Sequence, residues 1–234
     1  MIAASKAAGK HLLVGHHRRH HPHVAKLKSL LSDGHIGQPV VAQLIWCMRK
    51  PDDYFDIPWR AGMNGAPVKQ NLIHEVDMLR WLFGDIVEVI GLGSSAIRQA
   101  ERTESGGAIL RFSSGCLVTI AFADTTPTPW GFEAGTGESP AIPHTAQDCL
   151  RISGTKGGIE FPSLRVWSGA ETWNDRPFAT ENKAPSGVPL VRQLEHFAAV
   201  ITGRAPPLVT GQEGRASLAA TLQIEQATLP ASMR

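Results

Sequence analysis

Apolar residues recur with two different periods along this chain, and the period changes after Gly84. Apolar residues three and four positions apart predict an amphipathic helix over 69–83, with Leu72, Val76 and Leu79 on one ridge. Helices are predicted in the same way at the following places: 24–31, 189–203 and about 211–228. The helical segments therefore stand mainly at the two ends of the sequence.

Strand patterns fill the middle of the chain, where apolar and polar residues alternate between turn residues. Strands are predicted over 39–48, 86–96, 106–112, 116–124, 148–153, 158–161 and 164–168, and a buried strand over 11–15. Ser113, Ser114 and Gly115 predict a hairpin turn between two of them. Many strands in series between helical ends predict an α+β domain on a large, predominantly antiparallel sheet, with helices on one face and the other face open.

Composition narrows the class of protein without naming a reaction. Hydrophobic residues make up 42% of the 234 residues and charged residues 19%, which is typical of a globular domain. The formal net charge of +2 gives no support for a nucleic-acid or anionic-membrane partner. Cys47, Cys116 and Cys149 are few and far apart, so we expect free thiols and a cytoplasmic location. No apolar run reaches the roughly 18 residues of a membrane span, and we expect no membrane partner.

A stretch rich in imidazole and guanidinium groups, VGHHRRHHPH over 14–23, follows the first predicted strand. A metal site is disfavoured, because adjacent histidines lack the spacing of four found in helical metal motifs and Arg18 and Arg19 repel a dication. A purification tag is excluded by the internal position. A solvated basic loop remains an alternative, but the rim of a site for a polar or anionic ligand fits these donors best.

The helix over 69–83 carries a second candidate group. His74 lies within one helical turn of Gln70, Asn71 and Asp77, so these side chains share or border one face. Imidazole exchanges protons near neutral pH, and Asp77 is placed to orient it. On spacing alone, a capped, half-buried structural histidine is the favoured interpretation.

Two loops carry aromatic side chains beside polar ones. Trp59 and Arg60 precede the helix over 69–83 and are suited to pack on a flat ligand and to hold an anionic group, although a loop tryptophan often only anchors its loop. The long loop over 125–147 contains Trp130, Glu133 and His144, and its length favours a lid or a binding loop.

Taken together, several motifs resemble the Gfo/Idh/MocA family of NAD(P)-dependent oxidoreductases. These motifs are VGHHRRHHP, MRKPDDYFDIPWR, NGAPVKQNLIHEVDMLRWLFG, LRFSSG, GTKGG and LVRQLEHFAAVITGRAPPLVTGQEG. The resemblance covers nearly the whole chain, and the NLIHEVD and VTGQEG segments are its most specific parts. It implies hydride transfer between a nicotinamide cofactor, NAD or NADP, and a CH–OH carbon of a sugar, polyol, inositol or hydroxy acid.

The resemblance also assigns roles to residues. His74 matches the family's proposed acid/base or carbinol-binding histidine, and His17 and Arg18 match positions that face substrate and nicotinamide. Gln70 stands where many members have aspartate, so a titrating group is absent there. The predicted site residues are His74 as the catalytic group with Asp77 supporting it; His17, Arg18, Gln70, Asn71, Trp130 and His144 at the substrate; and His16, Trp59 and Arg60 at the cofactor, with no metal ligand.

Family members open with a Rossmann domain that carries a GxGxxG turn and a Glu-Lys-Pro motif, and neither motif occurs in this sequence. We therefore expect 1–22 to be a remnant of that α/β domain and 23–234 to be the substrate and oligomerisation domain. On this interpretation the chain is truncated and inactive by itself. The resemblance further implies a homo-oligomer formed through the open sheet face. The alternative is a non-enzymatic α+β domain that binds a ligand or a protein partner.

Overall fold

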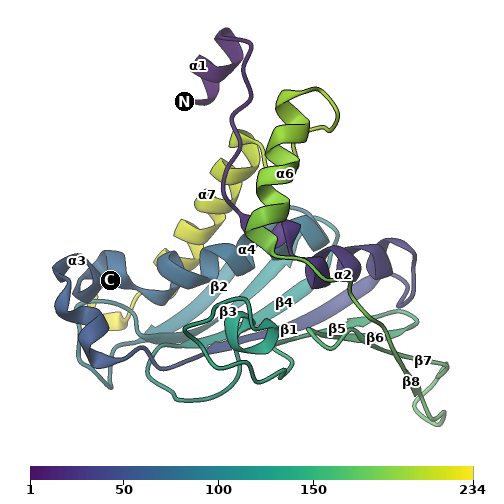
Figure 1. Cartoon of the computed structure of the whole chain (residues 1–234). Helices are drawn as coiled ribbons and strands as arrows, with labels where there is room; N and C mark the ends of the chain where they lie inside the picture. Colours follow the sequence, from purple (N-terminus) through teal and green to yellow (C-terminus); the bar gives the residue numbers. More distant parts are fainter. Residues whose placement is uncertain (234) are drawn as a thin grey trace.

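An eight-stranded sheet forms the base of the computed structural model, which describes residues 1–233 (Figure 1). The strands are β1 (Pro39–Cys47), β2 (Ile86–Ser94), β3 (Ser105–Phe112), β4 (Leu117–Ala123), β5 (Leu150–Gly154), β6 (Gly157–Phe161), β7 (Arg165–Ser168) and β8 (Phe178–Glu181). Their order is β2-β3-β4-β1-β5-β6-β7-β8, and every neighbouring pair is antiparallel except β1 and β4. The predicted α+β fold with a mostly antiparallel sheet is confirmed.

Helices lie mainly on one side of the sheet. The α-helices are α1 (Ile2–Ala7), α2 (Pro22–Ser32), α3 (Pro58–Ala61), α4 (Ile73–Phe83), α5 (Phe132–Thr136), α6 (Pro189–Ile201) and α7 (Gly211–Ala227). Shorter helical turns are η1 (His17–His20), η2 (Asp52–Asp56), η3 (Met63–Gly65), the π-helical η4 (Val68–Leu72) and η5 (Ala231–Met233). The long predicted helix is therefore continuous from η4 into α4, but its first turn is π-helical.

The core lies between the sheet and helices α2, α4 and α7. Alternation along β1 directs Ala42, Leu44 and Trp46 into this core, where each is no more than 2% exposed. Leu27 of α2 and Leu79 of α4 are fully buried against the same cluster. The opposite face of the sheet is exposed, as predicted, and carries apolar side chains in β2 and β3.

Helix α6 does not cover the sheet, so the prediction that both C-terminal helices do so is wrong. It stands away from the sheet, beside η1 and the chain that leads to it (Figure 1). Leu190, Leu194, Phe197 and Ile201 on its apolar side are all at least 45% exposed. Hydrophobic spacing predicts an apolar helical face, but it does not say which surface covers that face.

The buried strand predicted over 11–15 is also wrong. Only an isolated bridge joins Leu13 to Thr210, flanked by backbone hydrogen bonds from Val14 N to Val209 O (3.0 Å) and from Gly211 N to Leu12 O (3.0 Å). The side chains over 12–14 are half-buried rather than buried. An apolar run forms a strand only where neighbours pair with it along its length.

Candidate functional site

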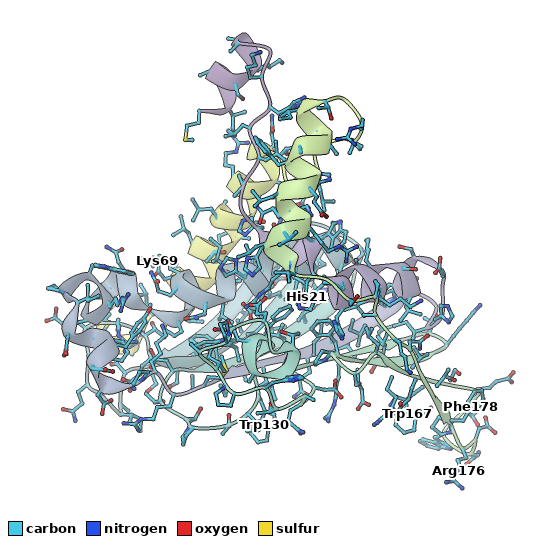
Figure 2. All side chains as sticks on the ribbon, in the orientation of Figure 1. His21, Lys69, Trp130, Trp167, Arg176 and Phe178 are labelled. Atoms are coloured by element: carbon cyan, nitrogen blue, oxygen red, sulfur yellow. The ribbon has the colours of Figure 1, made fainter. Side chains whose placement is uncertain are left out.

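The tight turn η1 places the histidine stretch beside α4. His21 caps the next helix, since its Nδ1 accepts a hydrogen bond from His23 N (3.2 Å) and Pro22 follows at the first helical position. The turn directs Arg18 and Arg19 inward, where they are only 1% and 3% exposed. Figure 2 shows His21 on the helical side of the sheet.

Arg18 is held in a cage of carboxylates. Its guanidinium forms ion pairs with Glu75 of α4, with Glu133 of α5 (Nη2–Oε1, 2.8 Å) and with Glu138 (Nη2–Oε1, 3.2 Å). Its central carbon lies 3.9 Å from the ring centre of Phe132. Its charge is therefore compensated inside the protein, while a substrate contact of Arg18 stays a prediction.

Two of the carboxylates around Arg18, Glu75 and Glu138, have pKa values shifted in opposite directions. Burial raises the pKa of Glu75 to about 7, against the opposing effect of Arg18. Burial alone would raise the pKa of Glu138 as well, but the hydrogen bond from His17 and the charge of Arg18 lower it to about 2. Glu75 therefore takes up a proton near neutral pH, whereas Glu138 stays ionised.

We expect the raised pKa of Glu75 to appear in the pH dependence of stability. The folded protein binds this proton more tightly than the unfolded chain, so the contribution is full below pH 4.5 and is lost as pH rises through about 7. In the wild type, the unfolding free energy should fall by about 2 to 3 kcal/mol between pH 4.5 and about 7 because of this group. Glu75→Gln should lack this fall, as measured by urea unfolding at several pH values. The exposed Glu88→Gln should keep the wild-type slope. An unchanged slope in Glu75→Gln would contradict the assignment.

Arg19 is neutralised separately by Asp77. Two hydrogen bonds, Nε–Oδ2 and Nη2–Oδ1, join them at 2.8 Å each, and Ser217 Oγ also donates to Asp77 (2.7 Å). Glu213 of α7 adds a third oxygen to Arg19 at 2.8 Å. Among the described residues Asp77 makes no hydrogen bond or ion pair with His74, so its predicted supporting role is replaced by one at Arg19.

Three imidazoles meet above these two ion-paired clusters. The ring centre of His74 lies 5.2 Å from that of His17 and 5.9 Å from that of His16, both edge-on. His17 Nε2 also lies 3.2 Å from Glu138 Oε2. The Nδ1 atoms of His16 and His74 are buried and have no hydrogen-bond partner within residues 1–233. We call His16, His17 and His74 the imidazole cluster.

His74 is held in its neutral form. Burial lowers its pKa to about 3, and the positive charge of Arg18 acts in the same direction. The sequence places His74 at a helix start, but the π-helical turn η4 precedes it, so burial rather than the helix terminus favours the neutral ring. A neutral ring with a free nitrogen is able to accept a proton from an alcohol.

The neighbours of His74 on the helix have separate partners. Gln70 Nε2 donates to Asn64 O (2.9 Å), and Asn71 Oδ1 is buried without a partner in the described chain. Lys69 pairs with Glu225 of α7 (3.0 Å), and Figure 2 places it well away from His21. Lys69 is thus directed to α7, while substrate contacts of Gln70 and Asn71 stay predictions.

Trp59 and Arg60 lie on the short helix α3, at the other end of the helical layer from α2 (Figure 1). The Arg60 guanidinium lies 4.3 Å from the ring centre of Tyr54 and 5.4 Å from that of Trp59. Trp59 is 49% exposed and is free to stack on a ligand. His16, the third residue predicted at the cofactor, is buried, and its Nε2 lies 4.0 Å from Asp77 Oδ1.

The loop over 125–147 contributes differently from the prediction. Trp130 lies on the open side of the sheet, where it lines a pocket with Gln43, Ile45 and Arg151, and Figure 2 shows it below the sheet. It therefore does not face the imidazole cluster. His144 is exposed, and its Nε2 lies 3.1 Å from Gly135 O, so it contacts α5, while a substrate contact stays a prediction.

Three carboxylates at the site were not predicted: Glu75, Glu138 and Glu213. Buried arginines require acidic partners, so the adjacent Arg18 and Arg19 were the sequence signal that carboxylates lie nearby. Glu213 also follows Thr210 in a capping pattern, and Thr210 Oγ1 accepts from Glu213 N at 3.2 Å. Trp46 adds to the site by donating from Nε1 to Glu133 Oε2 (3.0 Å).

Curated proteins resemble this chain over most of its length. A 1,5-anhydro-D-fructose reductase of Ensifer adhaerens is 25% identical over 236 residues, which cover 97% of this chain and 65% of that protein. A myo-inositol 2-dehydrogenase of Thermotoga maritima is 25% identical over 232 residues, which cover 93% of this chain and 62% of that protein. The chain thus spans a little under two thirds of the length of these relatives.

Solved structures share the fold at low identity. The WlbA dehydrogenase of Bordetella pertussis, in complex with NADH and UDP-GlcNAcA, matches with a TM-score of 0.70 at 23% identity, over 97% of this chain and 63% of that one. The aldose-aldose oxidoreductase of Caulobacter crescentus, complexed with glycerol, matches with a TM-score of 0.72 at 21% identity, over 97% and 64% of the two chains. The model of the GFO/IDH/MocA C-terminal domain matches residues 24–160, which is more than half of the sequence, and the chain belongs to this family.

Proposed function

We propose that this chain supplies the substrate-binding and proton-transfer part of an NAD(P)-dependent oxidoreductase that acts on a CH–OH group. The observation that carries the proposal is the imidazole cluster, in which His74 and His16 each keep a buried ring nitrogen without a partner in the described chain. Buried polar atoms without partners are rare and costly, so these nitrogens favour a ligand rich in hydroxyl groups. The names of the curated relatives support a sugar, a polyol or an inositol as that ligand.

A nicotinamide cofactor, when bound, would supply the hydride-transfer chemistry of the proposed reaction. The neutral His74 ring accepts the hydroxyl proton during oxidation and returns it during reduction. His16 and His17 flank this ring and orient the substrate through further hydrogen bonds. Arg18 and Arg19, fixed by their carboxylates, hold the η1 turn so that the three rings stay together.

The cofactor fits this chain only in part. Half-exposed Trp59 is suited to stack on a nicotinamide or adenine ring, and Arg60 beside it keeps a buried Nε without a partner among the described residues. The sequence contains no GxGxxG turn to hold a pyrophosphate at a helix terminus. The choice between NAD and NADP rests on a different residue of the nucleotide-binding domain, the one that contacts the ribose 2′-oxygen.

We expect this 234-residue chain to bind NAD(H) or NADP(H) very weakly by itself. The reason is that the sequence lacks the GxGxxG turn, whose backbone N–H groups hold a pyrophosphate. Isothermal titration calorimetry at cofactor concentrations up to about 1 mM should show no saturable heat. Micromolar affinity would contradict this expectation.

The proposed activity is tested in a chimeric protein. The part of the Thermotoga maritima myo-inositol 2-dehydrogenase that this chain does not match is joined to its N-terminus, and reduction of NAD or NADP is followed at 340 nm with a panel of inositols, aldoses, sugar acids and hydroxy acids. Turnover of at least one such alcohol supports the proposal. A well-folded chimera that binds the cofactor and oxidises none of them favours the non-enzymatic alternative.

We also propose a homo-oligomer that forms through the open sheet face. Ile90, Leu92 and Ile109 are 60%, 74% and 48% exposed there on neighbouring strands, which makes a continuous apolar surface. Sedimentation velocity should show a dimer or larger species, and Ile109→Glu should shift it toward the monomer. Val188→Glu, which changes an exposed residue outside the sheet, serves as the control. A wild-type monomer at high concentration would contradict the proposal.

A further inference from the structure

Cationic side chains gather around two aromatic rings beyond the end of β1. The four members are Lys50, Arg60, Arg98 and Arg102, and we call them the cationic cluster. Lys50 Nζ lies 4.8 Å from the ring centre of Tyr54, and the guanidinium of Arg102 lies 4.3 Å from that of Phe55. The two rings meet edge to face at 5.2 Å, so one aromatic pair collects all four cations.

The carboxylates around this cluster do not balance its charge. Asp124 is fully buried and pairs with Arg98 (Nη1–Oδ1, 2.8 Å) and Arg102 (Nη1–Oδ2, 2.7 Å). Asp52 pairs with Arg98 at 3.6 Å but is largely exposed. Within the described chain, neither Lys50 nor Arg60 forms an ion pair. Positive charge is therefore in excess around the buried Lys50 and Arg102, which is costly unless an anion compensates it.

Glu104 does not neutralise the excess positive charge of the cationic cluster. Its carboxylate is fully buried, but it accepts hydrogen bonds from the backbone N–H groups of Ile97 (2.5 Å) and Arg98 (3.1 and 3.0 Å). It is thus committed to the turn before β3. Glu133 also acts on the charge of Lys50, but it is paired with Arg18.

Several N–H donors of the cluster are unused. Lys50 Nζ and both Nε and Nη2 of Arg102 are buried without hydrogen-bond partners among residues 1–233. Lys50 is 8% exposed and Arg102 is 0% exposed. In Arg102 the two unused nitrogens form one edge of the guanidinium plane, which is the edge that binds two oxygens of a carboxylate or a phosphate side by side.

We propose that Lys50 and Arg102 form a binding site for an anionic oxygen group, a phosphate or a carboxylate. The free edge of Arg102 binds two of its oxygens, and Lys50 supplies a third donor and a compensating charge. Tyr54 and Phe55 shield the site from water, which strengthens these contacts. This site does not depend on the proposed oxidoreductase function.

The cover of the site is suited to open. Residues 51–66 contain only short helical turns, and Gly65 and Ala66 are the only buried residues in this range. A segment that buries so little opens locally at a low free-energy cost. An anion is therefore able to reach donors that the closed segment hides.

A series of contacts through Trp46 links the anion site to Glu133 and Arg18. Lys50 Nζ lies 5.9 Å from the Trp46 ring, and the indole of Trp46 donates to Glu133, which pairs with Arg18. If the proposed function also holds, a phosphorylated or acidic sugar places its charged group at Lys50 and Arg102 and its hydroxyls toward the histidines. That refinement rests on the proposed function, whereas the anion site itself does not.

The site is tested by calorimetric titration of the 234-residue chain with inorganic phosphate at pH 7 and constant ionic strength. Wild type should bind one phosphate saturably, and Lys50→Met should bind it about tenfold more weakly or worse, as expected for loss of a charged hydrogen bond. Arg111→Met, which removes an exposed arginine on the open face, should leave the affinity unchanged. Without phosphate, Lys50→Met should melt at a higher temperature than wild type, because an unpaired buried charge is gone.

A pH series on the wild type tests the site without any substitution. The pKa of Lys50 is lowered to about 8, mainly by burial. The charges of Arg102 and Arg98 also lower this pKa, and the charge of Asp124 opposes them. Sulfate keeps its charge over this range, so its affinity should fall as pH rises above about 8 and Lys50 loses its proton. Affinity that is independent of pH would overturn the role of Lys50.

Two further titrations distinguish the source of the anion. D-Glucose 6-phosphate and D-glucuronate are compared with free phosphate and with D-glucose. Tighter binding of the sugar anions than of phosphate supports a charged group on a sugar ligand, and equal binding supports a site for the free oxyanion. Absence of saturable binding of any anion to wild type, or equal binding by Lys50→Met, overturns the proposal.

Discussion

Replacing His74 with asparagine should lower the turnover of the chimeric oxidoreductase by about 100-fold or more, the usual effect of losing a general acid or base. Asparagine keeps a polar side chain of similar size, but it exchanges no proton. The effect should fall on the turnover number, since the histidine acts on the reacting hydroxyl. The measurement is steady-state kinetics with the best substrate found for the chimera.

Two controls separate catalysis from folding. His35→Asn changes an exposed histidine after α2 and should leave turnover unchanged. Cofactor affinity and melting temperature of His74→Asn should stay close to wild type, because the ring makes no hydrogen bond through Nδ1 that folding requires. A purely structural His74 gives the reverse result: a lower melting temperature with near-normal turnover per folded molecule. In that case the proton passes through another group, such as His17.

Replacing Arg18 with methionine should destabilise the fold by about 3 to 5 kcal/mol, the typical effect of removing one partner from a buried ion pair. The substitution leaves Glu75 and Glu133 buried without their cation, and methionine fills only part of the space over Phe132. The loss should grow as pH rises above about 7, where Glu75 ionises. Urea unfolding followed by circular dichroism measures both effects.

The matched control is Arg111→Met, since Arg111 pairs with Glu88 on the open face and both side chains are about half exposed. That substitution should change stability by less than about 1 kcal/mol. A double substitution is more specific: Glu75→Gln should recover part of the stability lost in Arg18→Met, because the stranded charge is removed. If Arg18→Met is as stable as Arg111→Met, the carboxylate cage does not anchor η1.

The sequence by itself determined the elements whose patterns are local. Alternation along β1 and β3, and the turn at Gly115 between β3 and β4, required no information from distant residues. Helices α2, α4, α6 and α7 followed from spacing of three and four. The sequence motifs also identified the family. Helical turns inside 49–66 and strand β8 carried no such pattern and were missed, since β8 is exposed along its whole length.

Tertiary structure alone decided what each side chain meets. The parallel pairing of β1 with β4 and the exposed position of α6 depend on the path of the whole chain. Arg18 has its guanidinium beside Glu133, a residue 115 positions later, and this pairing turns an apparent ligand donor into a buried support. Periodicity records which face of an element is apolar, because that face repeats every two or 3.6 residues. It does not record which charges share a buried volume, because that depends on contacts between residues far apart in sequence.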